Sequence, residues 1–424
     1  MATLISNSQD SAGLEKMLTP HMKKSMAYQD ASNQVASAEQ LQSTNRFQIN
    51  FNSLQLGARG IQFSIPNNDV ISDVVLTMGF QQLPVDVRLV RGWGMRMIEN
   101  LTIYVAGASP YRMTHYEIFG QAMRECDTQA KRDQYMKMCG QEVSDGPNEP
   151  APVCRIVLPL PWSSLRHSCE EHIGLDSALL SQPIRIVLDL ATPSQMFYGS
   201  GVSSAPTSLN LGYMQVRQEV FKDSSEMVIR EGLRRYAEKF YNYRFFYHQP
   251  FSSSEFDGAT DPTAPRTVSL NGFRNANLQS ITLLLEDQAN QPSNSLQYDK
   301  IQNLVLNYNG VDLFRANDGD SSPWCIVDSL SGKCAVGNEY VPNMTVTTPF
   351  TGGPTESEWT TVLMVPRDNK SFSGLIQSGL SVPNQTLVLT FTTPEGVNTK
   401  YRLHCTFSYS ASYLINQQNA EIMY

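Results

Sequence analysis

The sequence predicts an all-β protein that contains two copies of one domain. Three observations predict this: many short apolar stretches separated by turn residues, a self-similarity at a fixed offset, and a low content of charge. The chain has 424 residues, of which 41% are hydrophobic, so it is long and apolar enough to bury full cores. Only 17% are charged, against about 25% in typical soluble domains. Surfaces of this kind can be covered by other copies without burying many charges.

The strand signal begins at Arg46 and returns after residue 245. The stretches are rich in Val, Ile, Leu and Phe, many of them alternate, and Gly, Pro, Asn and Ser separate them. Many short strands with turn signals indicate sandwiches or barrels. The stretches are 46–51, 61–65, 70–78, 100–105, 154–160 and 184–190, and then 266–270, 280–285, 303–308, 360–365, 386–391 and 401–409.

An internal repeat is the most informative feature. IENLTIYVAGASPYR at 98–112 matches IQNLVLNYNGVDLFR at 301–315, with Ile, Asn, Leu, Gly and Arg recurring at an offset of 203 residues. The same offset relates IRIVLDL to TLVLTF, and an offset of 205 relates VLPLP to VLMVP. Alternating strands resemble one another in general, but a shared offset over strands this far apart favours two tandem domains. We expect the turn after the first strand to use Gly107 and Gly310, since glycine tolerates positive φ.

Two helical stretches interrupt the strands. Residues 110–139 are good helix formers after a strand, and we interpret them as an insertion over one end of a sandwich. Residues 223–240 open with a capping box formed by Asp223 and Glu226 and repeat apolar residues on one helical face. This second helix is placed where a joint between two domains would be.

Residues 1–45 form an arm rather than a domain. A weakly amphipathic helix is followed by a tract rich in Ser, Gln, Asn and Ala. Two interpretations stay open: an arm that docks on a neighbour or on a membrane surface, or a plain flexible terminus. The candidate contact residues of this arm are Leu14, Met17, Leu18, Lys23 and Lys24.

Composition excludes several classes of protein. The 32 Lys and Arg against 40 Asp and Glu give a formal net charge of -8, which argues against direct nucleic-acid binding. No stretch approaches 18 apolar residues, so no membrane-spanning helix is expected, and the N-terminus does not read as a signal peptide. The odd count of seven cysteines indicates reduced, mostly buried thiols. Four Asn-x-Ser/Thr sequons are interpreted as chance occurrences, whose use would need a nonstandard glycosylation route; they begin at Asn100, Asn343, Asn369 and Asn384.

No motif carries catalysis, a cofactor or a metal. Walker A and G-x-S-x-G sequences are absent. RHSCEEH at 166–172 matches no standard zinc spacing, and we interpret it as a polar loop. Glu170 and Glu171 would point to opposite faces of a strand, so they do not make a glycosidase pair. FYNYRFFYHQPF at 240–251 could stack single-stranded nucleic acid, but core and interface packing fits its single Arg better.

Several segments resemble the double jelly-roll major capsid proteins of nucleocytoplasmic large DNA viruses. The resemblance extends more distantly to the capsid proteins of tailless membrane-containing phages and to the adenovirus hexon. It covers about residues 46–424 and is loose: Pro and Asn are missing from the motif near 373–378, and a Gly is missing from the closing strand. The segments are IENLTIYVAGASPYRMTHYEIFGQAM, LPLPWSSLRHSCEEHIGLDSALLSQPIRIVLDL, MQVRQEVFKDSSEMVIREGL, LVLNYNGVDLFR, SGLIQSGLSVPNQTLVLTF and SYLINQQNAEIMY.

The resemblance implies two tandem eight-stranded jelly rolls with short helical insertions and an N-terminal arm. The implied domains are the arm at 1–45, a first jelly roll at 46–222, a linker helix at 223–245 and a second jelly roll at 246–424. The implied function is a structural major capsid protein, not an enzyme and without cofactors. Such a protein trimerises into pseudo-hexameric capsomers of an icosahedral DNA virus.

The implied partners are the chain itself, neighbouring capsomers, minor capsid and penton proteins, and lipid of an internal membrane. The implied location is the virion capsid, after synthesis in the host cytoplasm. The alternatives are a minor capsid or spike protein of the same fold, or a jelly-roll carbohydrate-binding protein.

Overall fold

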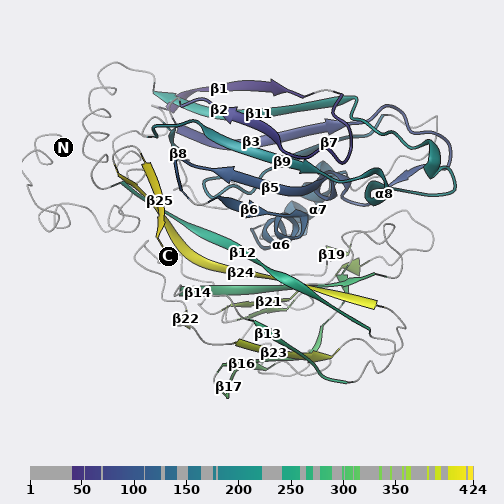
Figure 1. Ribbon diagram of the computed structural model, residues 1–424, viewed down its shortest axis with the longest axis vertical. Coiled ribbons are helices and arrows are strands. Elements are labelled where there is room, and N and C mark those ends of the chain that lie inside the picture. Colours follow the sequence, from purple (N-terminus) through teal and green to yellow (C-terminus); the bar gives the residue numbers. More distant parts are fainter. Residues whose placement is uncertain are drawn as a thin grey trace, which may run out of the picture.

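A computed structural model shows two β-rich lobes, one above the other in Figure 1. The first half of the chain forms the upper lobe and the second half forms the lower lobe. The structure describes residues 41–423 except 52, 68–69, 109, 126–128, 141–150, 164–174, 178–179, 222–240, 258–263, 271–276, 289–297, 300, 309, 316–333, 337–343, 346–355, 358–359, 364–379, 382–386, 393–399 and 417–418.

Two antiparallel sheets make the first lobe. The larger sheet has the order β1-β11-β3-β7, with β8 beside β3, and the smaller has the order β2-β9-β5-β6. The larger sheet contains β1 (Leu41–Asn50), β11 (Leu211–Phe221), β3 (Val70–Gly79), β7 (Val153–Val157) and β8 (Leu175–Asp176). The smaller contains β2 (Ile61–Ile65), β9 (Ile184–Leu190), β5 (Ile98–Tyr104) and β6 (Tyr111–Met113).

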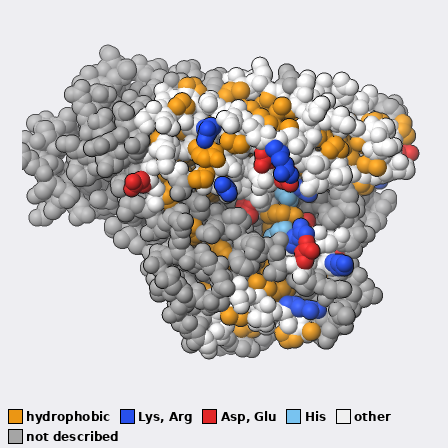
Figure 2. All heavy atoms as spheres, in the orientation of Figure 1, with side chains coloured by type: hydrophobic (Ala, Val, Ile, Leu, Met, Phe, Trp, Pro, Cys, Tyr) orange, Lys and Arg blue, Asp and Glu red, His pale blue; other side chains and the backbone are white. Residues whose placement is uncertain are grey.

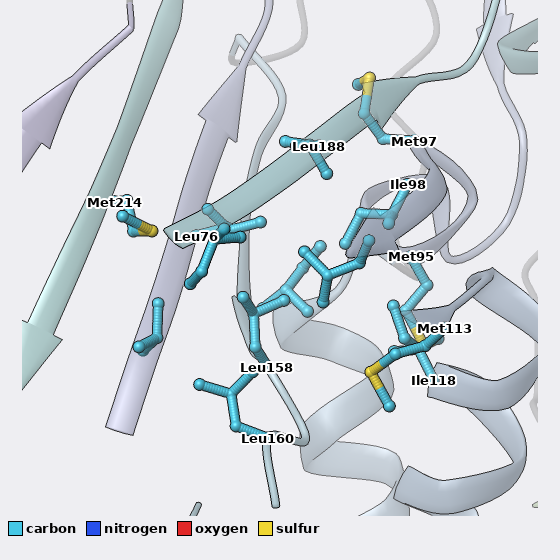
Figure 3. Packing of buried hydrophobic residues seen from close by; sticks show 14 of the residues in the cluster. Leu76, Met95, Met97, Ile98, Met113, Ile118, Leu158, Leu160, Leu188 and Met214 are labelled. Carbon is cyan, nitrogen blue, oxygen red and sulfur yellow. The ribbon is translucent and has the colours of Figure 1, made fainter. Parts of the chain in front are cut away.

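Alternating side chains explain why these strands pack as a sandwich. In β9 the Ile and Leu residues at every second position are buried, while Arg185 is exposed. Period-two alternation gives a strand one apolar and one polar face. The apolar faces of both sheets meet in one core, which Figure 3 shows from close by. Labelled there are Leu76, Met95, Met97, Ile98, Met113, Ile118, Leu158, Leu160, Leu188 and Met214.

The second lobe repeats the arrangement. Its larger sheet has the order β12-β24-β14-β21-β18, with β15 and β22 beside β14 and β25 beside β24, and its smaller sheet has the order β13-β23-β16-β17. The larger sheet contains β12 (Tyr241–Asp257), β24 (Lys400–Asn416), β14 (Asn277–Asp287), β21 (Thr360–Leu363), β18 (Cys334–Val336), β15 (Tyr298–Asp299), β22 (Leu380–Ser381) and β25 (Asn419–Met423). The smaller contains β13 (Arg266–Leu270), β23 (Leu387–Thr392), β16 (Gln302–Tyr308) and β17 (Val311–Arg315).

The strand connections give the jelly-roll topology. Along the two sheet orders of the first lobe, every connection except the β5–β6 hairpin crosses from one sheet to the other. The second lobe alternates in the same way, with β16–β17 as its hairpin, except that β18 and β21 both belong to its larger sheet. Double-sheet packing with such crossings is the jelly-roll solution to protecting sheet edges. The chain is therefore all-β and a double jelly roll, as the sequence predicted.

Pairing register confirms that the two lobes are copies. Thr102 pairs with Val187 in the first lobe, and Val305 pairs with Thr390 in the second, so both partners shift by the same 203 residues. The first pair joins β5 to β9 and the second joins β16 to β23, and these are the strands that the internal sequence repeat matches.

A side-chain hydrogen bond also recurs at the offset of 203 residues. The Asn100 amide donates to Asp189 Oδ2 at 3.3 Å, and the Asn303 amide donates to Thr392 Oγ1 at 3.1 Å, at the equivalent position. The hairpin glycine predicted in each copy is left-handed, with φ of 87° at Gly107 and 78° at Gly310. The predicted turns are therefore confirmed.

Short elements complete the described part of the chain. The helices are α5 (Trp93–Arg96), α6 (His115–Glu125), α7 (Gln129–Met138), α8 (Pro193–Met196) and the 3-10 turn η3 (Val202–Ser204). Two small sheets pair β4 (Arg88–Leu89) with β10 (Phe197–Tyr198), and β19 (Met344–Thr345) with β20 (Glu356–Ser357). Of the helices that the structure describes, none combines the length and apolar character that crossing a membrane requires.

The position of the helical stretch 110–139 differs from the expectation. It forms β6, α6 and α7, but α6 lies between the two lobes instead of over one end of a sandwich (Figure 1). The reason is tertiary: the face of α6 finds an apolar partner on the sheet of the other lobe.

Two expected boundaries fall close to observed strands. β1 begins at Leu41, within the range assigned to the arm, and β12 begins at Tyr241, within the range assigned to the linker helix. Residues 1–40 and 222–240, which hold the rest of both, lie outside the described residues.

Candidate functional site

The most elaborate set of contacts joins the two lobes. Strand β14 has a core on each of its faces. Ile281, Leu283 and Leu285 point into the core of the second lobe, whereas Leu284 belongs to the core of the first. Because successive residues of a strand face opposite sides, β14 is a wall shared by both lobes.

Helix α6 covers the first-lobe face of this wall. Phe119 of α6 is fully buried, and its ring centroid lies 5.1 Å from that of Tyr298 in β15. A Cβ built on Gly120 would lie 3.3 Å from Thr282 Cγ2, so the glycine permits close approach of helix and sheet.

A capping box fixes the start of α6. The backbone N–H and hydroxyl of Thr114 both donate to the carboxylate of Glu117, three residues later. The bond from the Thr114 backbone N–H is one half of a capping box, and it satisfies a donor at the start of the helix. Burial raises the pKa of Glu117, which the bonds from Thr114 partly oppose. The cap positions the next two residues, His115 and Tyr116, against the second lobe.

Glu286 of β14 is the polar centre of the junction. It is 5% exposed and accepts three hydrogen bonds at Oε2. The donors are the Tyr116 hydroxyl at 3.0 Å, the Gln288 amide at 2.7 Å and His404 Nε2 at 2.9 Å. A buried carboxylate needs such partners to offset its lost hydration. Burial and the Glu286 charge raise the pKa of Tyr116, so its hydroxyl keeps the proton that it donates.

Three aromatic rings stack across the junction. The Tyr116 ring lies 3.5 Å from the ring of His404 at 20°, and 3.8 Å from the ring of His115. Tyr116 and His115 belong to the first lobe, and His404 belongs to β24 of the second. Figure 2 shows histidine side chains beside basic and acidic ones in the strip between the two lobes.

His115 is the least satisfied group of this cluster. It is 5% exposed, and neither ring nitrogen has a hydrogen-bond partner. Burial lowers the pKa of His115 well below its usual value, and the positive charges of Arg96 and His404 lower it further, while a backbone contact with Ile98 opposes them weakly. The imidazole is therefore neutral when the lobes are docked.

The C-terminal strands β24 and β25 form a second contact between the two lobes. Ala411 and Tyr413 of β24 and Ala420 of β25 are buried in the core of the first lobe. The Ala420 N–H donates to the carbonyl of Ala106, in the β5–β6 turn, at 2.7 Å. Burying a side chain as large as Tyr413 contributes about 1.5–3 kcal/mol. The extended end of β24 and β25 (Figure 1) therefore acts as a clasp on the first lobe.

Exposed apolar side chains gather on the first lobe. Among the described residues, the large hydrophobic side chains classed as exposed are Val85, Val153 and Val202. Val85 lies in a turn and Val202 begins η3, and these two segments adjoin, because the Gly201 N–H donates to the carbonyl of Asp86 at 3.2 Å. Single exposed valines are common on soluble proteins, so they mark a surface without identifying what covers it.

The sequence-predicted site residues are placed as follows. The arm residues Leu14, Met17, Leu18, Lys23 and Lys24 lie outside the described residues, as do RHSCEEH and the sequons at Asn343, Asn369 and Asn384. Asn100 is exposed on β5 and bonded to Asp189. Among the residues that the structure describes, no three His, Cys, Asp or Glu side chains are grouped as metal ligands would be.

Three of the seven cysteines are described as free thiols. Cys139, Cys154 and Cys405 are buried, as expected from the sequence. Burial raises the pKa of the Cys154 and Cys405 thiols, so both stay protonated.

The sequence analysis did not predict the junction between the lobes. Two sequence patterns could have indicated it: Thr114 and Glu117, spaced as in a capping box at the start of a helix, and the unbroken apolar run Leu283, Leu284 and Leu285. A continuous apolar run is typical of a strand buried on both faces.

Comparisons with known proteins identify the fold. No protein-family model matches the chain, and no curated protein matches it in sequence. Among solved structures, PBCV-1 VP54, fitted into a reconstruction of the virophage Sputnik, is similar with a TM-score of 0.56 and 14% identity, over 90% of this chain and 98% of that one. The Faustovirus major capsid protein is similar with a TM-score of 0.53 and 10% identity, over 88% of this chain and 91% of that one.

A third solved structure extends the similarity. The STIV MCP has a TM-score of 0.50 and 9% identity, over 87% of this chain and 97% of that one. The similarity spans both lobes in each comparison, which confirms the double jelly-roll resemblance. At these identities it establishes the fold.

Proposed function

We propose that this chain is a structural major capsid protein that forms the shell of an icosahedral virus. The observation that carries the proposal is the pair of equivalent jelly rolls joined into one body, an architecture shared over about nine-tenths of the chain with capsid structures. A double jelly roll alone is a scaffold that hosts different functions. The full-length match and the rigid junction favour the capsid role over other uses of the fold.

Three copies of the chain would make a capsomer with a hexagonal outline. Each chain supplies two lobes with the same strand order, so a ring of three chains presents six similar lobes. Most soluble oligomers close by point-group symmetry, and threefold closure turns two similar lobes into a pseudo-hexamer that can tile a shell. The locked junction supports this role, because lateral forces within a shell act on both lobes of every chain.

The protein acts without catalysis or a cofactor. Tyr116 and His404 are bonded to Glu286 at the junction between the lobes, which suits a packing role. The alternatives of a minor capsid or spike protein and of a carbohydrate-binding protein receive no specific support from the described residues.

The partners we propose are other copies, minor capsid and penton proteins, and lipid beneath the shell. The net charge of -8 disfavours direct contact with the genome. The arm at 1–45, with Leu14, Met17, Leu18, Lys23 and Lys24, is proposed to contact neighbours or lipid at the inner face. The linker helix, expected at 223–245, is proposed to end before β12 begins at Tyr241 and to join the jelly rolls expected at 46–222 and 246–424. The location is the virion, after synthesis in the host cytoplasm.

Solution mass and electron microscopy of the purified chain test the proposal. We expect a particle of about three times the 47.4 kDa chain mass, with a hexagonal outline in projection. A stable monomer at all concentrations, with a thermal shift on adding sugars, would contradict the capsid role and favour the carbohydrate-binding alternative.

Deleting residues 1–40, which leaves β1 (Leu41–Asn50) in place, tests the role of the arm. Loss of trimers would show that the arm holds subunits together within a capsomer. Intact trimers that no longer assemble into larger arrays would place it between capsomers. Unchanged trimers and arrays would contradict a role of the arm in either contact.

A further inference from the structure

His115 lies where the two lobes meet, and groups from several elements surround it. Glu117 and Tyr116 come from α6, Arg96 ends α5, and Tyr298 comes from β15. On the facing sheet, Glu286 of β14 and His404 and Arg402 of β24 complete the set. Arg96 and His404 act on His115 as positive charges, and the Tyr116 ring separates its imidazole from that of His404.

A proton on His115 is poorly compensated in the docked arrangement. Both ring nitrogens would become donors, yet neither makes a hydrogen bond of good geometry, and the backbone of Ile98, which favours the proton, is outweighed by burial and by the charges of Arg96 and His404. The carboxylate of Glu286 at the junction is already engaged, since its Oε2 accepts from Tyr116, His404 and Gln288. An unpaired buried charge is strongly unfavourable, whereas water hydrates the imidazolium once the lobes separate.

We propose that the junction is an acid-sensitive latch: protonation of His115 is incompatible with α6 docked on β14 and β24, so mild acid releases the two lobes from each other. The sheets within each lobe remain folded when the lobes separate. The inference concerns the fold of this chain and does not depend on the proposed capsid role.

The direction of the pH dependence follows from proton linkage. Burial lowers the pKa of His115 in the docked state, so the undocked state binds more protons below about pH 6.5, the ordinary histidine value. The ratio of undocked to docked molecules then rises about tenfold for each pH unit below that value, until the docked state also protonates.

Glu117 contributes in the opposite direction. Burial raises its pKa, so as the pH falls the docked state takes up a proton before the undocked state does, and acid favours docking. If acid separates the lobes, the group responsible must therefore be one whose protonation disfavours docking. His115 is such a group, because its ring nitrogens make no hydrogen bond in the docked state.

The effect is confined to the junction because each lobe has its own core. The core of the second lobe is built from residues such as Ile281, Leu306 and Phe407. Most core residues of the first lobe come from its own two sheets and helices, with a few from β14, β15, β24 and β25. Acid should therefore expose α6 and the clasp of β25 before it exposes β9 or β23.

Hydrogen exchange of the full-length chain between pH 7.5 and 5.5 tests the latch, after correction for the intrinsic pH dependence of exchange. Peptides covering α6 and β25 should lose about tenfold protection per pH unit below 6.5, while peptides covering β9 and β23 keep theirs. The variant His115→Phe, which keeps an uncharged ring, should abolish this loss. His21→Gln, which removes a histidine from outside the described residues, should leave the loss unchanged and serves as the control.

Several results would overturn the latch. One is a wild-type chain whose α6 peptide shows no pH-dependent loss of protection. Another is a His115→Phe variant that retains the wild-type dependence. A third is loss of protection in β9 and β23 together with α6, which would show global unfolding. If His115→Phe does not fold, His115→Gln provides the same comparison, and the wild-type pattern still decides.

Discussion

Replacing Gly140 with alanine should destabilise the first lobe severely. Gly140 follows α7 with a φ of 86°, in the left-handed region. A Cβ at this position would lie 2.1 Å from Nε1 of Trp93, whose side chain is 1% exposed. The substitution therefore combines backbone strain with a steric overlap against a buried indole that has little room to move.

Gly107 and Gly310 serve as controls that separate backbone strain from steric overlap. Gly107 and Gly310 also have positive φ, of 87° and 78°, but a Cβ there would meet nothing within 4 Å. The left-handed conformation costs a residue with a Cβ about 1–2 kcal/mol, so Gly107→Ala and Gly310→Ala should each lose about that much. Overpacking a core adds about 1–3 kcal/mol, so Gly140→Ala should lose about 2–5 kcal/mol in total.

Urea denaturation of the three variants beside the parent measures this difference. The midpoint should fall furthest for Gly140→Ala, with an unchanged dependence on denaturant. Calorimetry should show the same order, since each 1 kcal/mol lowers the melting temperature of a unit of this size by about 2–4 °C. If Gly140→Ala were no worse than Gly107→Ala, the claimed clash with Trp93 would be wrong and strain alone would explain the loss.

Two further predictions concern the junction and the thiols. Glu286→Ala removes the buried acceptor shared by Tyr116, Gln288 and His404 and should lower the unfolding free energy by about 3–5 kcal/mol. Glu255→Ala, at an exposed carboxylate bonded to Arg402, should cost less than about 1 kcal/mol. Equal losses in the two variants would contradict the central role of Glu286. Because burial raises the pKa of Cys154 and Cys405 and the thiolate is the reactive form, peptide-resolved labelling at pH 8 should modify them only after unfolding. Rapid labelling of either thiol in the native chain would show that it is accessible.

The junction changes how the double fold is understood. The two jelly rolls share β14 as a wall, and the first lobe completes its core with Ala411, Tyr413 and Ala420 from the end of the chain. A chain cut between the lobes would expose those apolar contacts. The two similar lobes are therefore not independent: each has its own core, but they share β14 and the contacts made by the end of the chain.

Local sequence patterns were sufficient to predict the strands and the duplication of the domain. Alternation identified strands such as β9 and β23, because a strand with one buried face repeats its apolar residues with period two. The fixed offset related these strands to each other, and glycine at the hairpins identified the left-handed turns at Gly107 and Gly310. Each of these features depends on residues close together in the chain.

Tertiary structure alone decided where the lobes meet. Nothing local distinguishes the helix at 115–125 as an element between lobes rather than over one end of a sandwich. His115 and His404 are 289 residues apart in the chain, and only folding places both of them against the ring of Tyr116. The sequence by itself determined the strands, their copy number and their turns, because these follow from backbone and side-chain periodicity. The junction depends on which apolar surfaces remain uncovered once each lobe has formed, and that is a property of the assembled fold.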